Sequence, residues 1–224
     1  MIIMKPVLLI NFKTYEQGIG KNAIKLAKIA ESFGNKNVEI ILAVQPSDIY
    51  PVSKAVSLPV YAQHIDPVEF GSHTGWILPE AVKEAGASGT LINHSEHMVS
   101  VKEIKKCVSR AKDVGLKTVV CAPNQRFAKA LAEFGPDFIA VEPPELIGGD
   151  VSVSEAKPEV ISDSVKAVKN VNSKIRVLCG AGVHNAEDVR KALQLGSSGV
   201  LIASAIVKSK NPGLVIENIL EGFE

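Results

Sequence analysis

The segment around Glu142 contains the residues best suited to chemistry in this chain. The short apolar run Phe138–Val141 is followed directly by the carboxylate of Glu142. Two prolines and then two glycines come next, within Pro143–Asp150. Proline fixes the backbone φ angle and glycine frees it, so this pattern predicts a stiff hinge followed by a mobile tip. A carboxylate at such a hinge is suited to act as a general base beside a lid that closes over a substrate.

Two further segments offer partners for that carboxylate. Asn11 and Lys13 end one apolar run, and Asn93 and His94 end another. Residues two apart on a strand point to the same side, so we expect Asn11 and Lys13 to face the same way. The Ser-Glu pair after His94 is typical of the start of a short helix, whose positive end would disfavour a protonated imidazole. A carboxylate, an imidazole, a cation and an amide together could remove a proton beside a carbonyl and stabilise the enediolate oxygen.

Eight short apolar runs predict the strands that carry these residues. The runs are apolar on both faces, as strands that are covered on both sides must be. Stretches with apolar residues at helical spacing lie between them. The predicted strands are Val7–Phe12, Val38–Val44, Pro59–Gln63, Gly89–Asn93, Leu116–Ala122, Phe138–Val141, Ile175–Cys179 and Gly199–Ala203.

Glycines recur where the predicted helices end, just before the next strand. Glycine is the usual left-handed helix stop, so the repeating unit is strand, loop, helix, glycine, strand, which predicts a parallel sheet. Eight units of about 28 residues predict an α/β fold, a closed (β/α)₈ barrel formed as one domain by residues 1–224. The alternative is an open doubly wound sheet, but its usual Gly-rich turn is missing after the first strand, at Asn11–Thr14. The helix-ending glycines are Gly34, Gly86, Gly115, Gly135 and Gly196.

Small residues in two later segments predict a site for a phosphate group. The loop after the seventh run begins Cys179–Val183, and the eighth run ends within Leu201–Ala205. Small side chains let backbone N–H groups approach a ligand, and a short helix beginning near Ser204 would aim its positive end at the same point. Phosphate sites after the seventh and eighth strands are common in barrels of this kind.

In order and position, these motifs resemble those of the triosephosphate isomerase family, from Val7 to about Lys208. The resemblance implies interconversion of dihydroxyacetone phosphate and glyceraldehyde 3-phosphate through an enediolate, in glycolysis and gluconeogenesis, without a cofactor. It implies that Glu142 is the base, that His94 is the electrophile, and that Glu96 lies near the catalytic lysine. The residues that it implies for substrate and phosphate binding are Asn11, Lys13, Ile147, Gly148, Gly182, Ala203 and Ser204, of which Asn11 and Lys13 also count as catalytic.

Several positions depart from the commoner family pattern. Glu145 stands where a tryptophan usually follows the hinge, and Gly182 stands where a serine is usual. The lid tip ends in Gly149 and Asp150 rather than Thr-Gly, and we expect the Asp150 carboxylate to point to solvent, because it would repel a phosphate. Together with the short chain, these departures resemble the compact archaeal branch of the family. They leave the lid contacts open.

The loop Gln63–Trp76 predicts an oligomer. It is long for a strand-to-helix connection, which usually takes about 2–6 residues. It carries Phe70 and Trp76, and large apolar groups on an exposed loop usually mark a partner surface. The resemblance implies that this loop enters a neighbouring subunit, with Thr74 at its tip, in a homodimer or homotetramer. The alternative is that both aromatic side chains fold back on their own barrel.

Composition excludes several classes of protein. The net charge is +1, from 25 basic and 24 acidic residues, which argues against a nucleic-acid or anionic-membrane partner. No apolar run approaches the roughly 20 residues that span a bilayer. The start at Met1 shows no cleavage site, and Met4 could equally be the true start. Three widely spaced cysteines fit a reducing cytoplasm rather than disulfides or zinc, and the histidines outside the motif lack metal-ligand spacing, so we expect no metal.

Two other functions are open to a barrel with these residues. A Schiff-base lyase or aldolase needs a desolvated lysine at an inner strand end, for which Lys13 is the candidate. A non-catalytic phosphate-binding protein would have no reason to combine a base, an electrophile, a cation and a lid. The isomerase is therefore the leading hypothesis.

Overall fold

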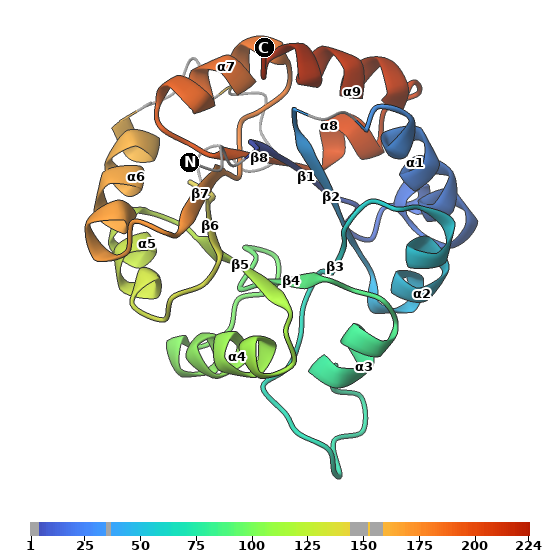
Figure 1. Cartoon of the computed structure of the whole chain (residues 1–224), viewed down its shortest axis with the longest axis vertical. Coiled ribbons are helices and arrows are strands. Elements are labelled where there is room, and N and C mark those ends of the chain that lie inside the picture. Colours follow the sequence, from blue (N-terminus) through green and yellow to red (C-terminus); the bar gives the residue numbers. More distant parts are fainter. Residues whose placement is uncertain (1–4, 35–36, 144–151, 153–158) are drawn as a thin grey trace.

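Eight parallel strands close into a barrel in the computed structural model, which describes residues 5–34, 37–143, 152 and 159–224 (Figure 1). Each strand pairs with the next along the chain, and the eighth pairs with the first. The predicted barrel is confirmed. The strands are β1 (Val7–Asn11), β2 (Glu39–Val44), β3 (Val60–Ala62), β4 (Gly89–Ile92), β5 (Lys117–Ala122), β6 (Phe138–Val141), β7 (Arg176–Cys179) and β8 (Gly199–Ile202).

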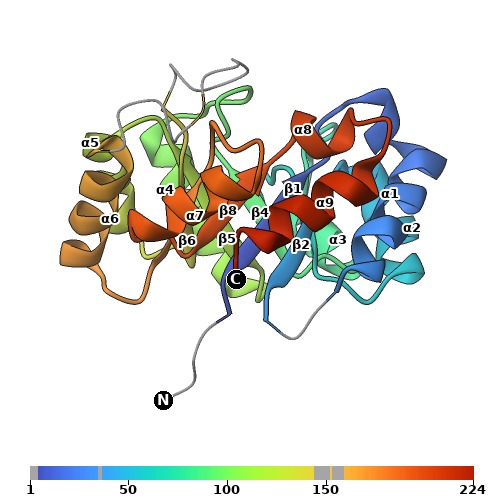
Figure 2. The same cartoon turned by 90° about the horizontal axis from the view of Figure 1, so that it is seen from above.

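Helices cover the outside of this barrel. Seen from above, α1 and α2 lie on one side of it and α5 and α6 on the other (Figure 2). A short 3₁₀ helix, η1 (Glu16–Gly18), precedes the first of them. The helices are α1 (Gly20–Ser32), α2 (Pro46–Ala55), α3 (Pro79–Glu84), α4 (Val101–Asp113), α5 (Gln125–Ala132), α6 (Glu159–Val171), α7 (Ala186–Gln194), α8 (Ser204–Val207) and α9 (Pro212–Glu221).

Alternation along the strands divides the buried residues into two cores. In β1, Leu8 and Ile10 pack against the helices, while Val7 and Leu9 fill the barrel interior. Both faces of a parallel strand are therefore buried, which explains the continuous apolar runs. The three cysteines, Cys107, Cys121 and Cys179, are buried free thiols.

Left-handed glycines end four of the helices, as predicted. Gly86, Gly115, Gly135 and Gly196 have φ values between +64° and +102°. Gly34 differs, because its φ is not positive, and it follows a turn in which its N–H donates to the carbonyl of Glu31. The strand ends also differ slightly from those predicted, since β3 has three residues rather than five.

The loop between β3 and α3 projects away from the barrel (Figure 1). Phe70 is 77% exposed and Trp76 is 52% exposed. The alternative in which these aromatic side chains fold back on their own barrel is therefore wrong. Among the described residues, no helix is long and apolar enough to cross a membrane.

The closing seam of the barrel depends on Gly199. This residue is in register with Val7, and a Cβ at position 199 would lie 2.1 Å from the Val7 carbonyl oxygen. We expect Gly199→Ala to lower the free energy of unfolding by about 3 kcal/mol or more, because backbone cannot move aside as a flexible side chain can. Urea denaturation measures this change. Gly213→Ala in α9 is the control, since its Cβ would meet nothing closer than 3.5 Å. Equal stability of the two variants would contradict the packing argument.

Candidate active site

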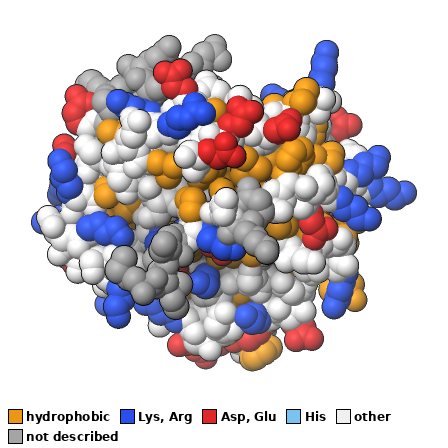
Figure 3. Space-filling view, turned by 45° about the horizontal axis from the view of Figure 1, so that its top comes forward, with side chains coloured by type: hydrophobic (Ala, Val, Ile, Leu, Met, Phe, Trp, Pro, Cys, Tyr) orange, Lys and Arg blue, Asp and Glu red, His pale blue; other side chains and the backbone are white. Residues whose placement is uncertain are grey.

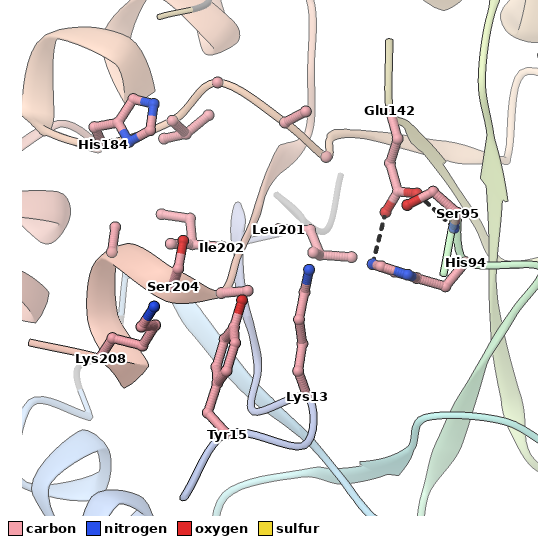
Figure 4. Close-up of a pocket in the computed structure, with 16 residues that line it drawn as sticks. Lys13, Tyr15, His94, Ser95, Glu142, His184, Leu201, Ile202, Ser204 and Lys208 are labelled. Carbon is pink, nitrogen blue, oxygen red and sulfur yellow. Dashed lines mark hydrogen bonds and ion pairs between the residues drawn. The ribbon is translucent and has the colours of Figure 1, made fainter. Parts of the chain in front are cut away.

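The carboxyl ends of the strands surround a cavity of about 370 Å³ (Figure 4). Lys13, His94 and Glu142, which come from three different strand ends, all line it. The residues predicted to bind phosphate line it as well, in the loops after β7 and β8: Gly182, Ala203 and Ser204. The lid positions Glu145, Ile147, Gly148, Gly149 and Asp150 lie outside the described residues.

Glu142 is fixed by the strands on both sides of β6. Its backbone N–H donates to the carbonyl of Ala122 at the end of β5, at 2.9 Å. On the other side, a Cβ on Gly180 would lie 2.7 Å from Glu142 Cγ, so only glycine leaves room for the side chain. Glu142 is 3% exposed. The carboxylate is therefore held away from water at the barrel mouth.

The two carboxylate oxygens of Glu142 have different surroundings. Oε2 accepts a hydrogen bond from the backbone N–H of Ser95 at 3.3 Å (Figure 4). Oε1 lies 3.4 Å from His94 Nε2 and is one of the few buried polar atoms that have no hydrogen-bond partner among the described residues. A buried acceptor without a donor is costly, and such atoms mark functional positions. Oε1 is therefore available to take a proton from a bound molecule.

His94 has its tautomer set by the backbone. The Glu96 N–H donates to Nδ1 of His94 at 3.2 Å, so Nδ1 is an acceptor and Nε2 carries the proton. The short helix predicted after His94 is absent. Instead, the His97 N–H donates to the His94 carbonyl at 2.7 Å and closes a tight turn. A single N–H aimed at the ring replaces the expected helix end.

Lys13 lies just beyond β1 in a strained backbone conformation. Its φ is +49°, a region that residues with a side chain rarely occupy. The Asn11 side chain accepts from the Lys13 N–H at 3.0 Å, and the Gln63 side chain donates to the Lys13 carbonyl at 3.0 Å. The ammonium lies 2.7 Å from Glu96 Oε1. These contacts hold the cation at the mouth. The strand alternation from which we expected Asn11 and Lys13 to face the same way does not apply to this pair, since β1 ends at Asn11 and Lys13 lies beyond it.

Asn93 connects two neighbouring segments of the barrel mouth through its side chain. The sequence placed it at a strand end but suggested no role for it. Its φ is +62°. Its amide nitrogen donates to the carbonyl of Cys121, and its oxygen accepts from the Val99 N–H, at 3.0 and 3.1 Å. Asparagine tolerates the left-handed conformation, which was the available signal in the sequence. By joining β5 to the turn that follows β4, Asn93 orients His94.

The thiol of Cys121 lies inside the barrel beside Glu142. Burial, and then the neighbouring Glu142 carboxylate, hold the pKa of Cys121 well above its usual value. The side chain is therefore a neutral thiol at physiological pH. From the sequence it was only one of three widely spaced cysteines, with no expected place beside Glu142.

The other end of the cavity is built from small residues and three larger polar ones. Gly182 has φ +70°, and Ser204 begins α8, where the first N–H groups have no partner within the helix. Tyr15, His184 and Lys208 line the same cavity. Sequence reasoning gave His184 no role and did not consider the other two. In the sequence, only their positions close to predicted site residues could have suggested them. Tyr15 comes two residues after Lys13, His184 two after Gly182, and Lys208 four after Ser204.

A second cavity of about 440 Å³ lies on the other side of Lys13. Asn11, Gln63, His64 and His97 line it, and the two histidine rings lie 4.3 Å apart between centroids, tilted by 33°. Burial, and then His97, lower the pKa of His64. Within the described part of the chain, no group of three or more His, Cys, Asp or Glu side chains could hold a metal ion.

Comparisons with known proteins agree on one family. The family model of triosephosphate isomerase matches residues 6–221. A triosephosphate isomerase of Methanothermus fervidus is 47% identical over 96% of this chain and 98% of its own. One from Archaeoglobus fulgidus is 48% identical over 96% of each chain. The crystal structure of the triosephosphate isomerase from Bartonella henselae superposes with a TM-score of 0.80 at 17% identity, over 98% of this chain and 99% of that one, which is a likeness of fold.

The hydrogen bond to His94 predicts a single tautomer. We expect ¹⁵N NMR to show Nδ1 of His94 as an acceptor-type nitrogen and Nε2 as the protonated one, because the Glu96 N–H occupies Nδ1. His73, exposed on the projecting loop, is the control and should show exchange between tautomers. A proton on His94 Nδ1 would refute this geometry.

Proposed function

The chain belongs to the triosephosphate isomerase family and interconverts dihydroxyacetone phosphate and glyceraldehyde 3-phosphate, and from the geometry of the barrel mouth we propose how its residues do so. The reaction moves a proton between neighbouring carbons, one of which is adjacent to a carbonyl. It therefore needs a base that can take and return the proton, and a donor that stabilises negative charge on oxygen. It is a step of glycolysis and gluconeogenesis.

Glu142 is the base in this proposal. Its Oε1 removes the proton from the carbon beside the carbonyl, and the electrons of that C–H bond form the enediolate. The same carboxylic acid then returns the proton to the neighbouring carbon, while the hydroxyl proton of the enediolate moves to the oxygen that began as the carbonyl, so that the other oxygen becomes the new carbonyl. The observation that carries the proposal is the buried Oε1, which has no hydrogen-bond partner among the described residues and lies 3.4 Å from His94 Nε2. A substrate bound against both of these atoms would contact the base and a donor at once.

His94 and Lys13 stabilise the enediolate. The Nε2 proton of His94 donates to the enediolate oxygen, while the Glu96 N–H keeps Nδ1 an acceptor. The Lys13 ammonium adds positive charge, and Asn11 positions it through the Lys13 N–H. Glu96 acts on both groups, through its side chain on Lys13 and its backbone on His94. A preorganised arrangement of this kind costs no rearrangement when charge develops.

The phosphate group of the substrate binds at the other end of the cavity. Gly182, Ala203 and Ser204 line that end with small side chains, so backbone N–H groups can approach the phosphate oxygens. Lys13 completes the set on the side of β1, where Asn11, which lines the second cavity, accepts from its backbone N–H. Ile147 and Gly148 are added on the family resemblance alone.

A Schiff-base aldolase fits this site less well. Its lysine would need desolvated surroundings, without a stable ionic partner. The Lys13 ammonium instead forms an ion pair with Glu96 at 2.7 Å, and β6 ends in a carboxylate. Failure of borohydride to trap a lysine adduct with either triose phosphate would support the isomerase mechanism.

We propose that the active unit is a homodimer or a homotetramer. The loop between β3 and α3 exposes Phe70, Trp76 and the tip residue Thr74. The second cavity, beside Asn11 and Lys13, has room for such a tip from another copy. Contact there would order the catalytic lysine, so activity would depend on assembly.

We further propose that residues 1–224 form one catalytic domain in the cytoplasm, with no nucleic-acid or membrane partner. The three free thiols support a reducing compartment. On the face shown in Figure 3, basic and acidic side chains are interspersed rather than gathered by sign, in keeping with the net charge of +1. Such a surface lacks the basic footprint of a nucleic-acid-binding protein.

Removing the base should abolish turnover with little effect on folding. We expect Glu142→Gln to lower kcat by roughly 10³-fold, because an amide cannot take the proton. Glu142→Asp should cost roughly 10²-fold, since its carboxylate is one methylene short. A coupled assay with glyceraldehyde 3-phosphate measures both. Glu133→Gln, on an exposed carboxylate after α5, is the control. Near-normal turnover in Glu142→Gln would end the proposed mechanism.

Disrupting the loop tip should separate the subunits. We expect Thr74→Arg to give a monomer with activity reduced roughly 10²-fold, because a small misplacement of Lys13 is costly. Light scattering and the coupled assay are measured on the same sample. Ser32→Arg, at the exposed end of α1, introduces the same charge elsewhere and should change neither the oligomeric state nor the activity. A fully active Thr74→Arg monomer would show that the loop is not an assembly element.

A further inference from the structure

The proposed phosphate site has a charge imbalance that Lys13 does not remove. A phosphate monoester carries a charge of about −1.5 to −2 near pH 7. Lys13 lines the cavity, but its ammonium already lies 2.7 Å from the Glu96 carboxylate. The carboxylate offsets part of the ammonium's charge, so Lys13 alone does not balance a phosphate dianion. Backbone N–H groups supply only partial charges, so the dianion needs another cation.

Lys208 is a cation in the same cavity that has no such carboxylate. Among the described residues, no Asp or Glu oxygen lies within 4.0 Å of its ammonium, whereas the other lysine of the cavity, Lys13, is paired. Lys208 follows α8 directly, and its N–H donates to the Ser204 carbonyl at 3.0 Å. The residue is thus one helical turn from the proposed phosphate donors.

Tyr15 holds the Lys208 ammonium at the cavity wall. Nζ lies 5.5 Å from the centre of the Tyr15 ring, within the range of a cation–π interaction. Tyr15 is half-buried and lines the cavity too. In Figure 4, Tyr15, Lys208 and Ser204 lie together, while Glu142 and His94 face each other at the opposite side. The aromatic face keeps the ammonium near the cavity without neutralising it.

We propose that Lys208, positioned by Tyr15, attracts the phosphate group of the substrate into the cavity and helps to retain it. This inference rests on the proposed phosphate site at Gly182, Ala203 and Ser204. Lys208 acts through its charge on binding and encounter, and it takes no part in proton transfer. Attraction of this kind is screened by salt, over about 8 Å at physiological ionic strength.

The first test compares Lys208→Gln with Lys210→Gln, an exposed lysine two residues further on that does not line the cavity. At low salt we expect Lys208→Gln to raise both the KM for glyceraldehyde 3-phosphate and the competitive Ki of inorganic phosphate by about fivefold, with kcat within about twofold of the parent. The effect should shrink as salt is added. Lys208→Arg keeps the positive charge, so its KM and phosphate Ki should be close to those of the parent. If Lys208→Gln matches Lys210→Gln at every ionic strength, the inference is overturned.

Two further pairs of variants separate the possible failures. Tyr15→Leu removes the ring face and should raise the phosphate Ki, whereas Tyr15→Phe keeps that face and should raise it less. Equal values would remove the positioning role of Tyr15. Ser204→Asp puts a carboxylate among the proposed phosphate donors and should abolish phosphate inhibition, with Ser173→Asp at the opposite barrel end as control. If Ser204→Asp leaves phosphate inhibition unchanged, the proposed phosphate site is wrong. If Ser204→Asp weakens phosphate inhibition and Lys208→Gln does not, the phosphate site stands and only the role of Lys208 fails.

Discussion

The pairing of β8 with β1 is the constraint on which the rest of this structure depends. Closure of the parallel sheet brings every strand end to the same mouth, so residues that are far apart in the chain become neighbours. Lys13 and Glu96 form an ion pair across 83 positions of sequence for this reason. The seam leaves space for no side chain at Gly199. The arrangement of side chains at the mouth therefore depends on close backbone packing along this seam.

The hydrogen-bonding groups of the mouth serve two purposes at once. Glu96 pairs with Lys13 through its side chain and fixes His94 through its backbone. Glu142 accepts from the Ser95 N–H with one oxygen and leaves the other unpartnered among the described residues. A turn of four residues thus sets the tautomer of the imidazole and the direction of the carboxylate.

Hydrophobic periodicity was enough to predict the barrel, because strands buried on both faces leave continuous apolar runs. The positions of Glu142 and His94 followed from the strand ends. The left-handed backbone of Lys13 was not predicted, and one of the side chains that bonds to it, Gln63, lies fifty residues later in the chain. The helix expected after His94 was wrong because a turn satisfies the same N–H groups locally. Tyr15 and Lys208 meet only in the folded chain, so no local pattern showed that they would lie together.

The buried thiols make sulfur chemistry in this protein dependent on unfolding. Burial raises the pKa of Cys107 and of Cys179 to about 12, and it holds the pKa of Cys121 well above its usual value. Oxidants and alkylating agents react with the thiolate, which is therefore scarce while the barrel is closed. Once the strands separate, all three sulfur atoms become ordinary reactive groups together. Irreversible ageing of the enzyme then follows the frequency of opening of the fold rather than the concentration of oxidant alone.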